Sequence, residues 1–330
     1  GTPESRNNNE YTCSAGSTHT FLPPGRAYRR SCECVMMPFR EYLEQVRPTV
    51  NRRIEEMAGD GEAVDPGVLP LLLKGKRMRA GLLLRVHTAL TRMTVPTPRA
   101  LDLACALEFA HAASLILDDM LDGDVVRRGA PAHHLTRGEG RAVLDAVGIL
   151  ALPYALAAPY GSQYVTMLAS AQQSMTRGVA WEVLEQPLLP SVELYDAVIT
   201  RKTGCLFSLA AAWGAMTAGA DENVVTAFAN FGLSAGKAMQ IADDIADLHV
   251  PGDCRPGSEA LLLQSISARD DRVGRALASL LDAEIARAAA RLRLLAPREQ
   301  RTFIQAVRDI VGITIAGPRI DKYRPAPNSS

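Results

Sequence analysis

Apolar residues recur every three or four positions along most of this chain, the spacing that places them on one face of an α-helix. Proline and glycine interrupt the pattern at several points and so divide it into separate helices. No run of alternating apolar and polar residues indicates a β-strand. The pattern predicts helices over residues 38–58, 67–93, 98–122, 139–158, 162–187, 192–202, 204–219, 222–248, 268–296 and 298–313.

Several of the predicted helices are long and apolar all round rather than on one face only. Helices of that kind are normally surrounded by other helices, so the sequence predicts an all-α fold. Residues 1–36 are polar and interrupted by proline and glycine, and they are predicted to form a disordered N-terminal extension. Residues 37–330 are expected to form a single all-helical domain.

No charged residue occurs between Asp145 and Arg177, which raises the question of a membrane span. A spanning helix needs about 20 consecutive apolar residues. Pro153, Pro159 and the polar stretch 160–164 interrupt this region before that length is reached. Two buried core helices, with no stable membrane insertion, are therefore the prediction.

Overall composition narrows the possible partners and the cellular compartment. The chain has 36 basic and 36 acidic residues, a balance that argues against a nucleic-acid surface as its main function. Three of the six cysteines lie in or beside strongly apolar segments, as buried free thiols do, and only Cys32 and Cys34 are closely spaced. This usage predicts a reducing, cytoplasmic location.

Two groups of three aspartates have the same i, i+1, i+4 spacing, and both follow an apolar helical segment. They are Asp118, Asp119 and Asp122 in the first group, and Asp243, Asp244 and Asp247 in the second. The first and last aspartate of each group share a helix face, where like charges repel by roughly a few tenths of a kcal/mol. Mg²⁺, which takes carboxylate and phosphate oxygens, is the cation that fits between two such groups. The alternative is a pair of solvated acidic helix ends.

Basic and polar residues that suit a phosphate group accompany both aspartate groups. They are Lys76 and Arg79 near the start of an apolar helix, His111 two turns before Asp118, Arg127 and Arg128 after the first group, Lys202 and Thr203 at a helix junction, and Gln240 before the second group. Lysine is scarce, with only five among the 36 basic residues, which draws attention to each one. Each residue also has a structural explanation, either complementing a helix dipole or packing in the core.

In combination, four segments between about residues 70 and 250 resemble the trans-prenyltransferases, or polyprenyl diphosphate synthases. The segments are GKRMR at 75–79, EFAHAASLILDDMLDGDVVRRGAPAHH at 108–134, KTG at 202–204 and GKAMQIADDIAD at 236–247. The resemblance implies an isoprenoid synthase-type bundle of about ten or more helices around a central cavity, usually in a homodimer. It also implies condensation of isopentenyl diphosphate with an allylic diphosphate, head to tail and trans.

The resemblance further implies a role for each matched residue. All six aspartates would hold Mg²⁺, three ions per active site, and Asp118, Asp119, Asp243 and Lys202 would be catalytic. The allylic diphosphate would contact Arg127, Lys202, Thr203 and Gln240, while isopentenyl diphosphate would contact Lys76, Arg79, His111 and Arg128. Cations around the diphosphate would let the allylic C–O bond ionise, and the isopentenyl double bond would attack the resulting carbocation.

Product length in the resembled family is limited by bulky residues that precede the first aspartate group. Ala113 and Ser114 occupy those positions here, and both are small. The resemblance therefore implies a product of C20 or longer, with Phe109 and Leu107 as candidates for a deeper floor.

Some expected features are missing from the sequence. The family has a Gly-Lys loop after the second aspartate group, whereas no lysine lies between Lys237 and Lys322, so only Arg255 could substitute. Where the family has Gly-Gln-x-x-Asp, this chain reads GVAWE at 178–182.

Three other functions stay open at this point. A class I terpene cyclase would need a glutamate where Ala238 follows Asn230 and Ser234, and an aromatic-lined cavity that a chain with 5% aromatic residues hardly supplies. A prenyltransferase for another acceptor is compatible with the altered loop. A non-catalytic regulatory subunit commonly loses one aspartate group, and this chain has both.

Overall fold

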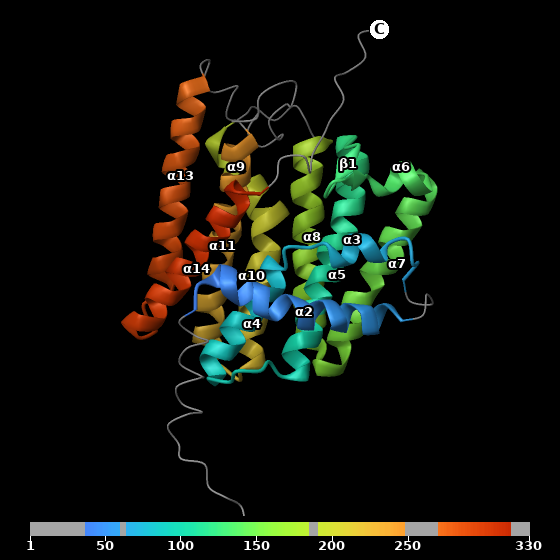
Figure 1. Cartoon of the computed structure of the whole chain (residues 1–330). Helices are drawn as coiled ribbons and strands as arrows, with labels where there is room; N and C mark the ends of the chain where they lie inside the picture. Colours follow the sequence, from blue (N-terminus) through green and yellow to red (C-terminus); the bar gives the residue numbers. More distant parts are fainter. Residues whose placement is uncertain (1–36, 60–63, 185–190, 248–269, 318–330) are drawn as a thin grey trace, which may run out of the picture.

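The computed structural model describes residues 37–59, 64–184, 191–247 and 270–317. It confirms the predicted all-α fold (Figure 1). The helices are α2 (Phe39–Ala58), α3 (Leu69–Leu73), α4 (Met78–Thr91), α5 (Pro98–Asp122), α6 (His133–Arg137), α7 (Glu139–Ala157), α8 (Ser162–Val183), α9 (Val192–Ile199), α10 (Cys205–Thr217), α11 (Glu222–Asp247), α13 (Asp270–Arg291) and α14 (Pro297–Ile315). A 3₁₀ turn, η1 (Ala158–Tyr160), a π-helical turn, η2 (Thr200–Gly204), and two short antiparallel strands, β1 (Val126–Arg127) and β2 (Ala130–Pro131), connect them.

Most helices stand side by side with similar axis directions, and α2 crosses in front of them in Figure 1. The apolar helix α10 lies inside the bundle and contacts α4, α5, α8 and α11. Helix α5 begins with two local signals, because the Thr97 side chain accepts a hydrogen bond from the Ala100 N–H and Pro98 occupies the first turn. It ends at Gly123, whose φ of 67° suits glycine.

The structure differs from the predicted helices most clearly at residues 74–77 and between α5 and α7. The continuous helix predicted over 67–93 is wrong, because the chain leaves the helical path at residues 74–77 and Arg77 has a left-handed φ of 61°. The β1–β2 hairpin and the short helix α6 were not predicted, because both are too short for a periodic pattern. The predicted disordered extension, residues 1–36, lies outside the described residues.

Helix α7 is less buried than its apolar sequence led us to expect. Two helical stretches of the described chain, α5 and residues 139–160, are long and apolar enough to cross a membrane by length and composition alone. In the most apolar 18-residue window of α5, 67% of the residues are buried, against 33% for residues 139–160. Val143, Leu144 and Val147 are among the exposed residues of α7. Helix α5 is therefore a core helix, whereas α7 has an apolar outer face.

Close packing of α10 against α4 depends on Gly214. A Cβ atom at this position would lie 2.5 Å from the Leu83 carbonyl oxygen and 2.8 Å from Val86 Cβ. Backbone atoms cannot move aside as the end of a flexible side chain can, so a methyl group here would push the two helices apart.

We expect Gly214→Ala to lower the free energy of unfolding by about 2 kcal/mol or more, because it overpacks this contact. Gly312→Ala in α14 is the matched control, since nothing lies within 4 Å of a Cβ there. Alanine is favoured over glycine inside helices by up to about 1 kcal/mol, so the control should be neutral or stabilising. Urea unfolding followed by circular dichroism would compare the two. Equal stability of both variants would contradict this account of the packing.

Candidate active site

Lys202 stands between two carboxylates that come from different helices. Its Nζ lies 2.6 Å from Glu182 Oε2, near the end of α8, and 3.5 Å from Asp118 Oδ1, near the end of α5. Glu182 is only 3% exposed. A carboxylate buried to that extent needs a cationic or hydrogen-bonding partner to remain charged. The ammonium group of Lys202 therefore joins the first aspartate group to α8.

Thr203, the next residue, begins a chain of hydrogen bonds that reaches the second aspartate group. Its hydroxyl donates to Gln240 Oε1 at 2.7 Å, and Gln240 Nε2 donates to Asp244 Oδ1 at 3.1 Å. The Tyr195 hydroxyl donates to the other oxygen of the Asp244 carboxylate at 2.6 Å. Since Lys202 and Thr203 are neighbours, the two aspartate groups lie on either side of one turn.

That turn is the π-helical segment η2. Helix α8 can approach it closely because residue 178 is a glycine. A Cβ atom on Gly178 would lie 2.7 Å from the Lys202 backbone nitrogen and 2.8 Å from Arg201 Cβ. On the same helix, the Trp181 ring lies beneath the Arg201 guanidinium, 4.3 Å from ring centroid to Cζ. Single π turns inside helices are frequent at functional sites. Here the turn presents Lys202 and Thr203 in different directions.

Asp119 is held by Arg127 instead of facing solvent. Arg127 Nε donates to Asp119 Oδ1 at 2.6 Å, with a second contact from Nη2 to the same oxygen, and Nη2 also lies 3.2 Å from Asp124 Oδ2. Asp119 and Asp124 are each 1% exposed. Burial raises the pKa of Asp119, although Arg127 opposes this rise. Strand β1 therefore places Arg127 against the last turn of α5.

Several arginine side chains form a cluster around His111. Burial lowers the pKa of His111 well below its ordinary value, and nearby arginines, Arg79 and Arg128 first among them, lower it further. Arg79 is itself buried over the Phe207 ring, 4.9 Å from the centroid, and its Nε has no hydrogen-bond partner. Burial lowers the pKa of Arg79 to about 10. A neutral imidazole and a guanidinium with an unused donor are well suited to an anionic ligand.

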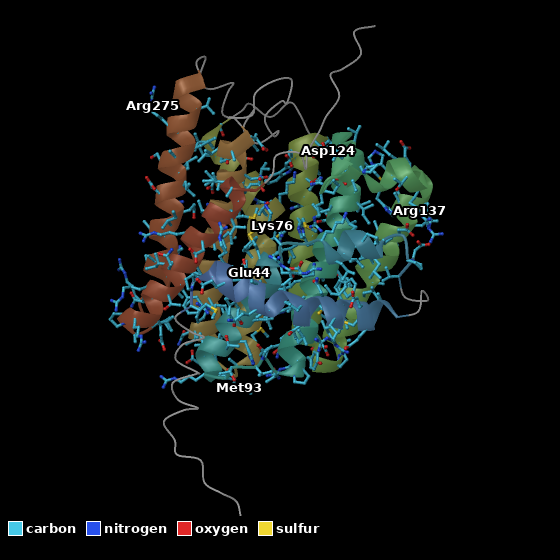
Figure 2. The ribbon with its side chains drawn as sticks, viewed as in Figure 1. Glu44, Lys76, Met93, Asp124, Arg137 and Arg275 are labelled. Carbon is cyan, nitrogen blue, oxygen red and sulfur yellow. The ribbon has the colours of Figure 1, made fainter. Side chains whose placement is uncertain are left out.

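The ammonium group of Lys76 lies beside the C-terminal end of α14. A Cβ on Gly317, just beyond that helix, would lie 2.6 Å from Lys76 Nζ and 3.2 Å from the Thr314 carbonyl oxygen. The end of a helix carries partial negative charge, which attracts an ammonium group. Figure 2 shows Lys76 near the middle of the molecule and Asp124 at the upper end of the bundle.

Comparison with known proteins identifies the family. A family model described as polyprenyl synthetase matches residues 68–253, which is more than half of the chain. This chain belongs to the polyprenyl synthetase family. The matched region contains both aspartate groups, the η2 turn and the cluster around His111.

Individual polyprenyl synthetase relatives cover a smaller part of the chain. A geranylfarnesyl diphosphate synthase from Methanosarcina mazei is 34% identical over 52% of this chain and 58% of its own length. A geranylgeranyl diphosphate synthase from Pseudescherichia vulneris is 31% identical over 64% of this chain and 73% of its own. This chain thus spans only about three fifths of the first relative. The crystal structure of a geranyltranstransferase from Methanosarcina mazei has a TM-score of 0.61 and 27% identity, over 82% of this chain and 95% of that one.

The structure brings most of the predicted site residues to two places in the polyprenyl synthetase fold. Asp118, Lys202, Thr203, Gln240 and Asp244 surround η2. Arg79, Arg127 and Arg128 lie within electrostatic range of His111, whereas Lys76 lies at the end of α14. Three aspartates of the two groups are half-buried at the same helix ends, namely Asp122, Asp243 and Asp247. Arg127 and Gln240, expected to contact substrate, are paired with protein groups.

The carboxylates of the two aspartate groups are suitable ligands for a hard divalent cation, but they do not form a complete coordination site by themselves. Within the described ranges, no three His, Cys, Asp or Glu side chains converge on one point where a metal ion could bind. Carboxylate oxygens are nevertheless the ligands that Mg²⁺ prefers. A cation, the Lys202 ammonium, already lies between Asp118 and Glu182. The donor set therefore fits a metal ion that would bind together with further oxygen ligands.

Sequence reasoning missed two residues that contact this site. Glu182 was noted only as a departure from the expected GQxxD pattern, yet it makes the shorter of the two Lys202 ion pairs. Tyr195 was not considered, although it lies seven residues, about two helical turns, before Lys202 and donates to Asp244. The signal for Glu182 was available, because an acidic residue at the end of a nearly uncharged helix needs a partner.

Proposed function

We propose that this protein is a metal-dependent trans-prenyltransferase that condenses isopentenyl diphosphate with an allylic diphosphate. The observation that carries the proposal is the position of Lys202 and Thr203, which connect the two aspartate groups across the single turn η2. A ligand at that turn would meet carboxylates from α5 and α11 together with an ammonium group. Membership of the polyprenyl synthetase family and the names of the relatives at 34% and 31% identity support the same activity.

Mg²⁺ is the metal ion that we propose for the site. Asp118, Asp119 and Asp122 would hold it from one side, and Asp243, Asp244 and Asp247 from the other, with three ions per active site. When bound, such ions neutralise a diphosphate and make it a better leaving group. Asp119 would have to exchange Arg127 for the metal, which leaves that guanidinium available to the diphosphate.

The protein's own residues would divide the two diphosphates between them. Arg127, Lys202, Thr203 and Gln240 would bind the allylic diphosphate and stabilise charge on its leaving oxygen. Lys76, Arg79, His111 and Arg128 would bind isopentenyl diphosphate and hold its double bond close to the allylic carbon. Neutral His111 would donate one hydrogen bond from the imidazole N–H. The surrounding apolar helices would exclude water from the carbocation.

A product of C20 or longer fits the small residues beside the first aspartate group. Ala113 is fully buried and Ser114 donates its hydroxyl proton to the His111 carbonyl oxygen at 2.8 Å, and neither places a large side chain below the site. Ala106 and Ala110, further down α5, are also buried and small. The names geranylfarnesyl and geranylgeranyl diphosphate synthase in the relatives agree with such a length.

A homodimer in the cytoplasm is the proposed assembly and location. The outer face of α7 supports the dimer, because Leu144 is 69% exposed, Val147 58% and Val143 40%. These residues lie on one face at helical spacing, and contiguous exposed apolar patches commonly mark an interface. A second copy of the chain could cover this face by a two-fold contact.

Incubation of the purified protein with isopentenyl diphosphate, Mg²⁺ and C5, C10 or C15 allylic diphosphates tests the activity. We expect linear polyprenyl diphosphates, identified by mass spectrometry. Asp118→Asn and Asp243→Asn should each lower turnover by about two orders of magnitude or more, because they weaken metal and diphosphate binding. Asp282→Asn, an exposed aspartate of α13, is the control and should retain activity. A cyclised hydrocarbon, or allylic substrate consumed without isopentenyl diphosphate, would contradict the proposal.

Ala113→Phe should shorten the longest product, because a phenyl ring would occupy the space directly below the first aspartate group. Ala142→Phe controls for the general effect of a large residue at a buried alanine, since Ala142 lies on α7. Product chain length would be read by mass spectrometry with the same primer for both. An unchanged product distribution in Ala113→Phe would refute this position for the growing chain.

The double variant Leu144→Glu/Val147→Glu should convert a dimer into a monomer, because two charges would have to be buried at the interface. Light scattering coupled to size-exclusion chromatography would give the mass of each species. Leu294→Glu tests the effect of a charge at another exposed apolar residue (51% exposed), and it should remain dimeric. A monomeric wild type, or a dimeric double variant, would count against an interface on α7.

A further inference from the structure

Arg77 lies between two residues of the proposed isopentenyl diphosphate site but points into the protein. It is 3% exposed and stands at the start of α4 with a left-handed φ of 61°. Its Nη1 lies 3.0 Å from Glu108 Oε2, its Nε donates to Asn51 Oδ1 at 2.8 Å, and its Nη2 donates to the Leu72 carbonyl oxygen. All three nitrogens of the guanidinium are thus used inside the protein.

Glu108, on α5, is the ion-pair partner of Arg77. It is 4% exposed, and while Oε2 pairs with Arg77, Oε1 accepts a hydrogen bond from the Ala80 N–H at 3.1 Å. Ala80 is in the first turn of α4, where N–H groups lack helical partners. Arg77 occupies the N-cap position and supplies no side-chain cap of its own, so a carboxylate from another helix takes that role.

The space around the pair is too small for a larger residue at position 75. A Cβ atom on Gly75 would lie 2.6 Å from Arg77 Nη1 and 3.4 Å from Glu108 Oε2. The glycine of the GKRMR segment therefore makes room for the ion pair.

The pair fixes two groups of the proposed site relative to each other. Lys76 precedes Arg77 directly, and Arg79 follows it by two residues on the turn that Glu108 caps. On α5, Glu108 lies one turn before His111, on the helix that also carries Asp118. Burial lowers the pKa of Arg79, and among the neighbouring charges Glu108 does most to raise it again.

We propose that the Arg77–Glu108 ion pair is a positioning unit, which holds Lys76 and Arg79 in register with His111 and Asp118 without touching substrate. The identity of the substrate here rests on the proposed function. A purely structural role is the alternative. Removing one partner of a buried pair destabilises a protein in either case, so stability alone does not distinguish the two.

The test compares Glu108→Gln and Arg77→Met with wild type by steady-state kinetics. Glu108→Gln retains an oxygen that can accept the Ala80 N–H but loses the charge. For both variants we expect the KM for isopentenyl diphosphate to rise about tenfold or more, because the register of its binding groups is lost, with the KM for the allylic diphosphate within about twofold. Arg77→Lys, which retains the charge but loses the planar fork, should recover part of the effect.

The pH dependence gives a readout that a loss of stability alone would not change. The pKa of Arg79 is about 10 in the wild type, and loss of the Glu108 charge should lower it. Because only protonated Arg79 binds diphosphate, the KM for isopentenyl diphosphate should begin to rise at a lower pH in Glu108→Gln than in wild type. The KM for the allylic diphosphate should have the same alkaline profile in both.

Arg85→Met is the matched control, because Arg85 is buried on the same helix and lies over the Tyr42 ring, 4.7 Å from the centroid. It should lower stability and leave both KM values within about twofold. The proposal is overturned if the Glu108 and Arg77 variants raise both KM values equally or leave the isopentenyl diphosphate value unchanged.

Calorimetry with inorganic pyrophosphate separates failure of this proposal from failure of the proposed function. If the wild type consumes no isopentenyl diphosphate with any primer, the proposed function fails. Even then, positioning requires pyrophosphate to bind Glu108→Gln about fivefold or more weakly than Arg85→Met, since the anion meets the same cations. Equal dissociation constants for the two variants would reject the positioning role.

Discussion

The structure depends on cations that separate carboxylates brought together at one end of a helical bundle. Lys202 lies between Asp118 and Glu182, and Arg127 lies between Asp119 and Asp124. Without these partners, acidic side chains that are 1% to 3% exposed could not remain ionised where they are. Two cations therefore offset part of the charge of four carboxylates before any ligand binds. Under the proposed function the same two cations bind a diphosphate, and that dual use would connect the folding of this end to its chemistry.

Close helix packing is what allows these charges to meet. Gly178 lets α8 approach η2, and Gly236 lets α11 approach it, because a Cβ on Gly236 would lie 2.9 Å from Gly204 Cα. The η2 turn itself departs from α-helical geometry and so directs two consecutive residues toward opposite aspartate groups. Apolar α10 continues directly from this turn into the core. The position of Lys202 is thus fixed by the packing of the bundle rather than by a flexible loop.

The fold was predicted well from the sequence, whereas most contacts within the site were not. Apolar periodicity located the long helices, and proline and glycine located most of their ends, since those signals are local. The break at residues 74–77 was not predicted, and the buried partner of Arg77 at this break, Glu108, is about 30 residues away in sequence. The aspartate groups were recognised by spacing alone. That Arg127 pairs with Asp119, or Tyr195 with Asp244, depends on how helices pack and has no local signal. Arg255, the suggested substitute for the missing loop lysine, lies outside the described residues.

Ligand binding at such a site would be an exchange of partners instead of the filling of an empty space. Under the proposed function, Arg127 would leave Asp119 to contact a metal-bound diphosphate, and Lys202 would share its ammonium between Glu182 and the ligand. Each exchange replaces one charge-assisted contact by another, so the net gain in free energy is smaller than the new contacts alone suggest. Arg79 is different, because its buried Nε has no partner to give up. The burial cost of that guanidinium is already present in the folded protein, and an anion that accepts its hydrogen bond would relieve it. The two proposed diphosphate sites would therefore differ. Binding at one would exchange partners among paired charges, whereas the other already contains a buried donor without a partner.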